Sequence, residues 1–325
     1  SRFVRGGHWR NFMAIYPESG RMHMKAAELA DLCRERGAGQ DARRAVGRAR
    51  CNDAYWHGVF GGLYLRHLRE ALWANLAEAE GILRAGEALS WAVVEHRGDG
   101  PRELRVHSRS FAASLSLDRG GALTELVDFD ARRNRADVLT RRWQSDHRTG
   151  VGLTPPPDGG ASPSARSSRD HADAEGGMPS IHALEERIGF DELPPYDAHE
   201  RALTAERVLV ADQTKESYAA GDYHPVRSWE EETPELAIHE EGERLRIALS
   251  FDGRGRLRKE IIFDEDGTLE IRYEWDAGAF PRDAWFTPEL SVSWEPELTY
   301  DPAPSELWRY DIGTVSKSES GAERS

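Results

Sequence analysis

The sequence predicts an α+β protein with more than one domain, in which an N-terminal helical bundle is followed by an antiparallel β-sandwich. Three observations lead to this prediction. Apolar residues recur at helical spacing up to about residue 84. After residue 89, apolar and polar residues alternate in several segments. The length of 325 residues also exceeds what one hydrophobic core usually supports. We therefore expect a helical region over residues 1–86 and a β-sandwich over residues 87–325.

Three segments of the first part have the apolar spacing of amphipathic helices. The first begins near Ser19, which can act as a cap, and has apolar residues at three- and four-residue steps until Gly37. The second, residues 40–50, is rich in arginine and has a narrow stripe of alanine and valine. The third, residues 65–84, has a regular series of leucines. Together they predict a bundle of about three helices.

The second part has the alternation of β-strands. Residues 111–117 and 123–129 alternate around a turn and predict a β-hairpin. Residues 245–251, 257–263 and 269–275 alternate around glycine-containing turns and predict a meander of three antiparallel strands. Residues 144–179, in contrast, are rich in proline, glycine, serine and aspartate, so we expect a disordered insert there.

The composition excludes several classes of partner and location. Lysine and arginine number 43 against 57 aspartates and glutamates, a net charge of -14, so nucleic acid and anionic membranes are poor candidates. Two cysteines, Cys33 and Cys51, do not make a disulfide framework. The chain has no apolar run of roughly 20 residues and begins without the apolar stretch of a signal peptide. We expect a soluble, cytoplasmic protein.

Five candidate substrate-binding residues lie together at the junction of the second and third helices: Asn52, Asp53, Tyr55, Trp56 and His57. Asn52 and Asp53 can cap the following turn, the two aromatic rings offer flat faces, and the imidazole can donate or accept near neutral pH. This combination suits a sugar. The alternative is an ordinary helix junction with buried aromatic residues, which is the more common outcome of such a pattern.

The junction also carries a family resemblance. The string CNDAYWHGVFGGLYL, residues 51–65, with HLREALW behind it, resembles the last characteristic sequence region of glycoside hydrolase family 57, specifically its 4-α-glucanotransferase and α-amylase-like members. Residues 5–12 and the string Tyr16-Pro17-Glu18-Ser19 resemble the segment that joins the barrel of that family to its helical region. Further similarity to its C-terminal β-domain lies in residues 103–137, 180–190, 285–291 and 310–319.

The resemblance implies an enzyme that processes α-1,4-glucan with retention, by transfer or hydrolysis, and a β-domain of the mutarotase-like supersandwich type. Retention requires two carboxylates roughly 5 Å apart. In the family both lie on a (β/α)7 barrel that has no counterpart here, so we expect no catalytic residue in this chain and no activity from it alone. The five junction residues would then contact the sugar, with Trp56 as a stacking platform and Asp53 and His57 bonding to hydroxyls. The expected partner is α-1,4-glucan or a maltooligosaccharide, and no cofactor is expected.

Other interpretations remain open. The chain could be a non-catalytic carbohydrate-binding or interaction module, or a split-gene fragment whose aromatic first residues contact a separate barrel subunit. The spacing of histidines and cysteines predicts no metal site. Acidic turns at residues 128–130 and 264–266 could bind Ca²⁺, although solvated turns are more common. The later tryptophans could stack on glucan, although they more often fill a core.

Overall fold

The computed structural model of the chain describes residue 13 and residues 15–56, 62–95, 102–142, 196–253 and 255–293. The chain divides into two compact units: residues 1–140 with 197–325, and residues 141–196. The predicted insert, residues 144–179, belongs to the second unit and lies outside the described residues. The elements below all belong to the first unit, which combines helices with antiparallel sheets in an α+β arrangement.

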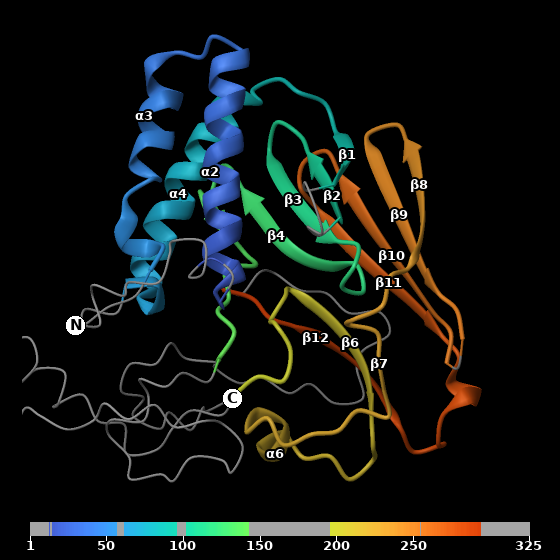
Figure 1. Cartoon of the computed structure of the whole chain (residues 1–325). Helices are drawn as coiled ribbons and strands as arrows, with labels where there is room; N and C mark the ends of the chain where they lie inside the picture. Colours follow the sequence, from blue (N-terminus) through green and yellow to red (C-terminus); the bar gives the residue numbers. More distant parts are fainter. Residues whose placement is uncertain are drawn as a thin grey trace, which may run out of the picture. The chain divides into compact units, whose positions relative to one another are not determined.

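Three helices form the N-terminal region (Figure 1): α2 (Pro17–Glu35), α3 (Gln40–Arg48) and α4 (Arg66–Leu83). They agree with the three predicted helical segments, and their apolar faces meet in one core that includes Met22, Leu29 and Leu76. The prediction that Ser19 caps the first helix is wrong. Helix α2 begins instead at Pro17, which suits a first helical position because its nitrogen has no hydrogen to leave unbonded.

The strands of the described residues form three antiparallel sheets. The five-stranded sheet follows chain order: β1 (Ser90–Glu95), β2 (Arg102–His107), β3 (Phe111–Ser116), β4 (Ala122–Asp128) and β5 (Arg133–Asn134). The four-stranded sheet has the order β11 (Leu269–Trp275), β10 (Leu257–Asp264), β9 (Arg244–Phe251) and β8 (Glu235–Glu241). The third sheet consists of β12 (Trp285–Leu290), β6 (Thr204–Leu209) and β7 (Arg227–Ser228), with the short helix α6 (Lys215–Ala219) between β6 and β7 in the chain.

Two predicted β motifs are present. The hairpin corresponds to β3 and β4, and the meander corresponds to β9, β10 and β11. Strand β8 extends the meander by one strand that was not predicted. Its sequence is polar along most of its length, as expected of a strand at the edge of a sheet.

The five- and four-stranded sheets share one hydrophobic core. Phe111 of β3 stacks on Phe263 of β10, with ring centroids 5.3 Å apart and planes 17° apart. Behind them, Lys259 is fully buried, and its Nζ lies 2.8 Å from Glu206 Oε1 and 2.9 Å from Thr204 Oγ1. A buried ammonium group is tolerated only when it is paired in this way. The ion pair therefore joins the four-stranded sheet to the third sheet.

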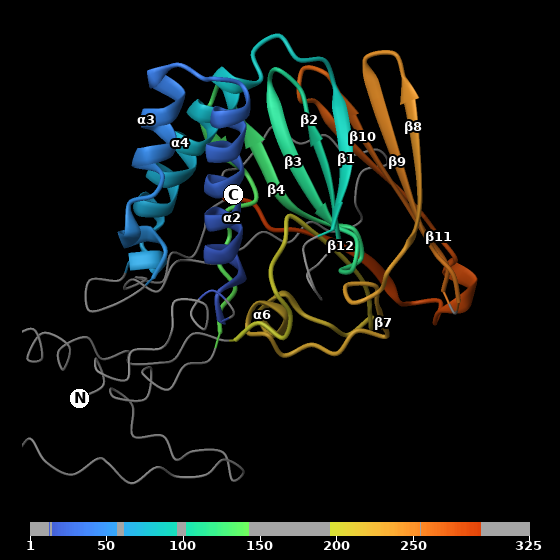
Figure 2. The same ribbon diagram turned by 45° about the horizontal axis from the view of Figure 1, so that its top comes forward.

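The helices cover the opposite face of the five-stranded sheet, as Figures 1 and 2 both show. Strand β3 is consequently buried on both sides: Phe111 and Ala113 face the four-stranded sheet, and Ala112 packs in the core of the helices. Lys25 of α2 joins the layers, because its Nζ lies 2.6 Å from Glu80 Oε2 on α4 and 2.7 Å from Glu125 Oε1 on β4. Burial alone would lower the pKa of Lys25, but these two carboxylates outweigh it and raise that pKa.

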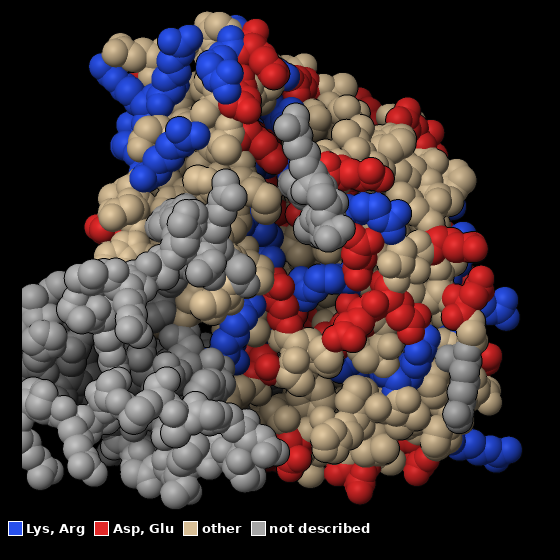
Figure 3. Space-filling view, viewed as in Figure 1, with Lys and Arg blue, Asp and Glu red and all other residues tan. Residues whose placement is uncertain are grey.

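Charge is unevenly distributed over the surface. Figure 3 shows lysine and arginine side chains gathered over α3, where Arg43, Arg44 and Arg48 are exposed, whereas acidic side chains are spread over the sheets. On this face the acidic side chains therefore lie mainly away from α3. None of the helices in the described part of the chain is long and apolar enough to cross a membrane.

Candidate functional site

The predicted sugar-contacting residues lie in the connection between α3 and α4. After Arg48 the chain forms a 3-10 turn, η1 (Asn52–Ala54), and a second one, η2 (Gly62–Tyr64), comes before α4. The backbone N–H of Tyr55 donates to Asn52 O at 3.0 Å, and that of Leu63 donates to Trp56 O at 2.8 Å. Ala54 and Leu63 are buried and anchor the two turns in the helical core. The two described ends of the connection, residues 49–56 and 62–65, are thus packed against the helical core.

Tyr55 fixes the position of this connection. It is 3% exposed, and its hydroxyl donates to Ala49 O at 2.7 Å. Burial raises the pKa of this hydroxyl to about 12, so it stays protonated and remains a donor at neutral pH. The Ser19 hydroxyl donates to Tyr55 O, which ties the first turn of α2 to the connection. Tyr55 was expected to offer a flat face to the ligand, whereas the structure places its ring inside the core.

Trp56 lies beside Tyr55 in the chain but has the opposite environment. It is 42% exposed, which is rare for so large an apolar ring, and Asn52 and Asp53 are exposed with it. Neither polar side chain caps the turn, since Cys51 holds the cap position and no side-chain cap bond forms there. Among the described residues, Asn52 and Asp53 also make no side-chain hydrogen bond, so both groups are available to a ligand. His57 lies outside the described residues.

Two further residues near the connection were not singled out from the sequence. His23 of α2 lies edge-on to the Tyr55 ring, with the two ring centroids 6.2 Å apart. Tyr64 of η2 lies with its hydroxyl 2.9 Å from that of Tyr16, which is buried at the start of α2. The spacing of residues within one helix does not reveal contacts of this kind, because they join segments far apart in the sequence.

The alternative sites considered from the sequence have ordinary structural surroundings. The Asp128 carboxylate accepts from Ala131 N at 2.9 Å, and Asp264 pairs with Arg244 at 2.6 Å. Trp229 is fully buried, and Trp275 stacks on Phe286 at 5.2 Å. Within the described ranges no three His, Cys, Asp or Glu side chains are grouped as metal ligands. The exposed connection at Trp56 is therefore the candidate that has both a ring face and available polar groups.

Comparison with family models identifies the relatives of the chain. Residues 7–83 match the middle domain of alpha-amylase/4-alpha-glucanotransferase, and residues 97–296 match the C-terminal domain of the same family. The chain belongs to this family. The expected resemblance to the 4-α-glucanotransferases and α-amylases of glycoside hydrolase family 57 is thereby confirmed. The middle-domain match ends at residue 83, where α4 also ends, and it contains the whole connection around Trp56.

Individual alpha-amylase/4-alpha-glucanotransferase family members agree with this assignment. The chain is 32% identical to a 4-alpha-glucanotransferase of Thermococcus kodakarensis and 30% identical to an alpha-amylase of Pyrococcus abyssi, in each case over 98% of this chain and 49% of the relative. It therefore spans about half the length of these relatives. The crystal structure of the 4-alpha-glucanotransferase from Thermococcus litoralis has the same fold over 83% of this chain and 36% of its own, with a TM-score of 0.58 and 24% identity.

Proposed function

We propose that this chain forms the sugar-contacting flank and the support domain of an α-glucan-processing enzyme of the retaining 4-α-glucanotransferase or α-amylase type. Membership of the family supports the substrate class. The observation that carries the proposal is the exposed Trp56 beside Asn52 and Asp53, on a connection that Tyr55 holds in place. The three sheets would form the mutarotase-like supersandwich expected from the sequence.

Each residue of the connection has a distinct role in this proposal. The Trp56 indole stacks on one face of a glucosyl ring, where C–H groups meet the negative face of the aromatic system. Asn52 and Asp53 bond to ring hydroxyls, and His57 adds a further donor or acceptor. Tyr55 does not contact the sugar itself. Its buried hydroxyl donates a hydrogen bond to Ala49 O and keeps the turn rigid, so that the turn loses little conformational freedom when the sugar binds.

The first test measures binding. We expect the chain to bind maltooligosaccharides saturably in isothermal titration, and Trp56→Ala to weaken the affinity about tenfold, the loss that removal of one stacking ring would cause. Asp53→Ala should weaken it less. Trp91→Ala is the matched control, because Trp91 lies on β1, away from the connection, and its indole N–H donates to Glu240. Equal affinities of the wild type and Trp56→Ala would refute the cleft assignment.

The second test measures turnover. Formation of a glycosyl intermediate needs a nucleophile and an acid roughly 5 Å apart, and we place both on a barrel outside this chain. We therefore expect no disproportionation of maltooligosaccharides by the chain alone, because binding contacts without those carboxylates do not stabilise the transition state. Sustained product formation by a clean preparation would show that the chain has its own catalytic residues.

Two alternatives remain. A non-catalytic binding module would, like the proposed flank, bind glucan without turnover, whereas a split-gene fragment would also bind a separate barrel subunit encoded beside it. A barrel encoded immediately upstream would favour the second. A cytoplasmic location is part of the proposal and is supported by the two cysteines, Cys33 and Cys51, which are both free thiols.

A further inference from the structure

Arg69, near the start of α4, is a buried cation beside the Trp56 connection. Its side chain is 3% exposed and makes hydrogen bonds in two directions. On one side its Nη1 donates to Leu63 O at 2.6 Å. On the other side its Nε lies 3.2 Å and 3.3 Å from the two carboxylate oxygens of Asp137, whose side chain is 7% exposed. A buried guanidinium group is tolerated only when it is paired, so these two partners hold its position.

Leu63 extends this contact to Trp56. The carbonyl of Leu63 accepts from Arg69, and the N–H of the same residue donates to Trp56 O at 2.8 Å. Leu63 is fully buried, so water does not readily replace either partner. Two hydrogen bonds therefore lead from the Arg69 guanidinium group to the backbone of Trp56.

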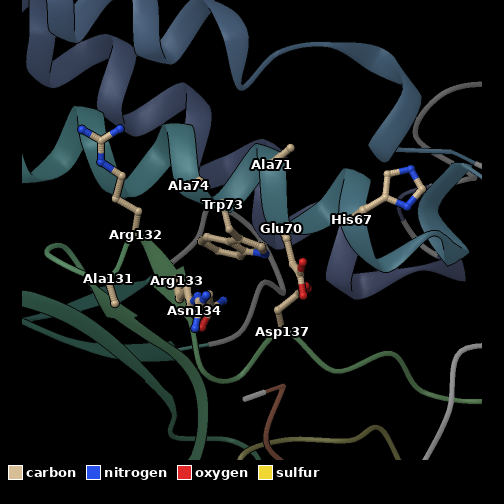
Figure 4. Close-up of a pocket in the computed structure, with 10 residues that line it drawn as sticks. All are labelled: His67, Glu70, Ala71, Trp73, Ala74, Ala131, Arg132, Arg133, Asn134 and Asp137. Carbon is tan, nitrogen blue, oxygen red and sulfur yellow. The ribbon is translucent and has the colours of Figure 1, made fainter. Parts of the chain in front are cut away.

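Asp137 anchors the other side of Arg69 on the five-stranded sheet. It follows β5, and Figure 4 shows its carboxylate reaching towards α4 beside Glu70. Asn134, within β5, accepts at Oδ1 from Leu126 N of β4 at 3.0 Å. The pair of Arg69 and Asp137 thus joins the sheet to the connection.

The residue before Trp56 is held from a different direction. Tyr55 O accepts from the Ser19 hydroxyl of α2, and the Tyr55 hydroxyl donates to Ala49 O. The bond from Leu63, in contrast, reaches Trp56 itself. Because the Trp56 side chain is 42% exposed, packing constrains its ring only in part, and the backbone contacts on both sides set where the indole stands.

We propose that Arg69 is a positioning residue for sugar binding: held by Asp137, it keeps Leu63, and through Leu63 the indole of Trp56, in the place that suits a glucosyl ring. Arg69 itself does not touch the sugar. The identity of the ligand rests on the proposed function, whereas the link from Asp137 to Trp56 rests on the contacts alone.

The first variant is Arg69→Met, which removes the donor to Leu63 O and keeps a long side chain. We expect the affinity of the full chain for maltotriose, measured by isothermal titration, to fall about tenfold, the order of one lost charge-assisted hydrogen bond. Without sugar, the indole N–H signal of Trp56 should shift in the NMR spectrum. That signal is assigned among the ten tryptophans by its disappearance in Trp56→Ala.

Arg84→Met is the matched control, because it makes the same chemical change at the opposite end of α4. Arg84 pairs with Glu80 at 2.8 Å and with Glu87 at 3.1 Å. The control should change neither the affinity for maltotriose nor the Trp56 signal. Equal responses of the Trp56 signal to Arg69→Met and Arg84→Met would overturn the positioning role.

A double variant separates positioning from stability. Arg69→Met alone leaves Asp137 buried without its cation and should lower the urea concentration at the midpoint of unfolding. Adding Asp137→Asn removes the unpaired charge and should restore part of the stability, so this variant also serves if Arg69→Met does not fold. Leu63 O still lacks its donor, so the affinity should stay about tenfold below that of the wild type. Recovery of the affinity together with the stability would show a purely structural role.

Failure of the positioning role differs from failure of the proposed function. If the wild type binds maltotriose and Arg69→Met binds it equally well, the positioning role is overturned and the proposed function stands. If the wild type does not bind but the Trp56 signal moves in Arg69→Met and not in Arg84→Met, the link stands and the cleft assignment is refuted. If the wild type does not bind and the signal stays fixed, both are refuted.

Discussion

At the scale of single residues, Glu289 is a largely buried acidic group that is held by ion pairs with Arg207 and Arg201. Its Oε2 accepts from Arg207 Nη1 at 2.6 Å and from the Tyr218 hydroxyl, and Arg201 lies nearby. Burial alone would raise the pKa of Glu289, but Arg207, Tyr218 and Arg201 outweigh it and lower this pKa below its ordinary value of 4.5. The pair therefore stabilises the fold above about pH 4.5, and this contribution is lost as the pH falls through the lower pKa of the folded state.

Replacing Glu289 by Gln should therefore change both the size and the pH dependence of stability. We expect the free energy of unfolding at neutral pH to fall by about 3 kcal/mol, because Arg207 is left buried without one of its carboxylates. The further loss of stability in acid should be smaller than in the wild type. Urea unfolding at a series of pH values measures both. Glu231→Gln is the control, since that carboxylate is 84% exposed. Parallel stability curves for wild type and Glu289→Gln would contradict the argument.

The candidate site shows what a sequence does and does not reveal about single residues. The string that begins at Cys51 was enough to predict the family of the chain. It did not predict that Tyr55 is buried while Trp56 is exposed. Helical periodicity stops at the end of α3, and Tyr55 and Trp56 follow the 3-10 turn η1 without a regular repeat that would assign either side chain to the core. Tyr55 is held in the core by contacts with Ser19, on helix α2, and with Ala49, at the end of helix α3. Neither contact can be read from the sequence next to Tyr55.

At the scale of elements, the turn between β3 and β4 depends on two consecutive glycines. Gly120 has a φ of 61°, and a Cβ added there would lie 2.5 Å from Trp229 O, a backbone atom that cannot move aside easily. Gly120→Ala should therefore lower the free energy of unfolding by about 3 kcal/mol or more, through strain and steric overlap together. Gly37, after α2, has a φ of 57° but no atom within 4 Å of such a Cβ. Gly37→Ala should cost about 1 kcal/mol.

These two variants separate the effect of backbone conformation from that of packing. Thermal or urea unfolding of both, under one set of conditions, gives the comparison. Equal losses for Gly120→Ala and Gly37→Ala would mean that the close approach to Trp229 contributes nothing, so that only the left-handed backbone matters.

The strands differ in how well their sequences predicted them. Strands β9, β10 and β11 were predicted because apolar residues alternate and glycine turns separate them. Strand β6 was not predicted, because its sequence does not alternate between apolar and polar residues. All six of its residues are buried, although Thr204, Glu206 and Arg207 are polar. Polar residues in a buried strand are stable only with partners, here Lys259 and Glu230, which come from other strands and segments. Strand β12 contains Pro288, which also weakens a strand prediction.

At the scale of the whole molecule, the helices and the sheets of the first unit are joined by buried polar contacts as well as by apolar packing. Lys25 lies between Glu80 of α4 and Glu125 of β4, and Arg69 of α4 pairs with Asp137. The helical core also contains Val127 and Phe129 from the sheet side. A helical region that opened alone would expose these side chains and separate these charges, so we expect helices and sheets to unfold as one cooperative unit.

Lys25→Met tests this cooperativity. The change leaves Glu80 and Glu125 buried without their shared cation, which should lower the free energy of unfolding by about 3–5 kcal/mol. Native-state hydrogen exchange at the amides of Leu29, in the helical core, and Ile261, in the sheet core, should report the same loss. Arg44→Met, at an exposed position of α3, should change neither amide. If protection fell at Leu29 and stayed constant at Ile261, the helical region would unfold by itself, and the Trp56 connection would be open to rearrangement without any cost to the sheets.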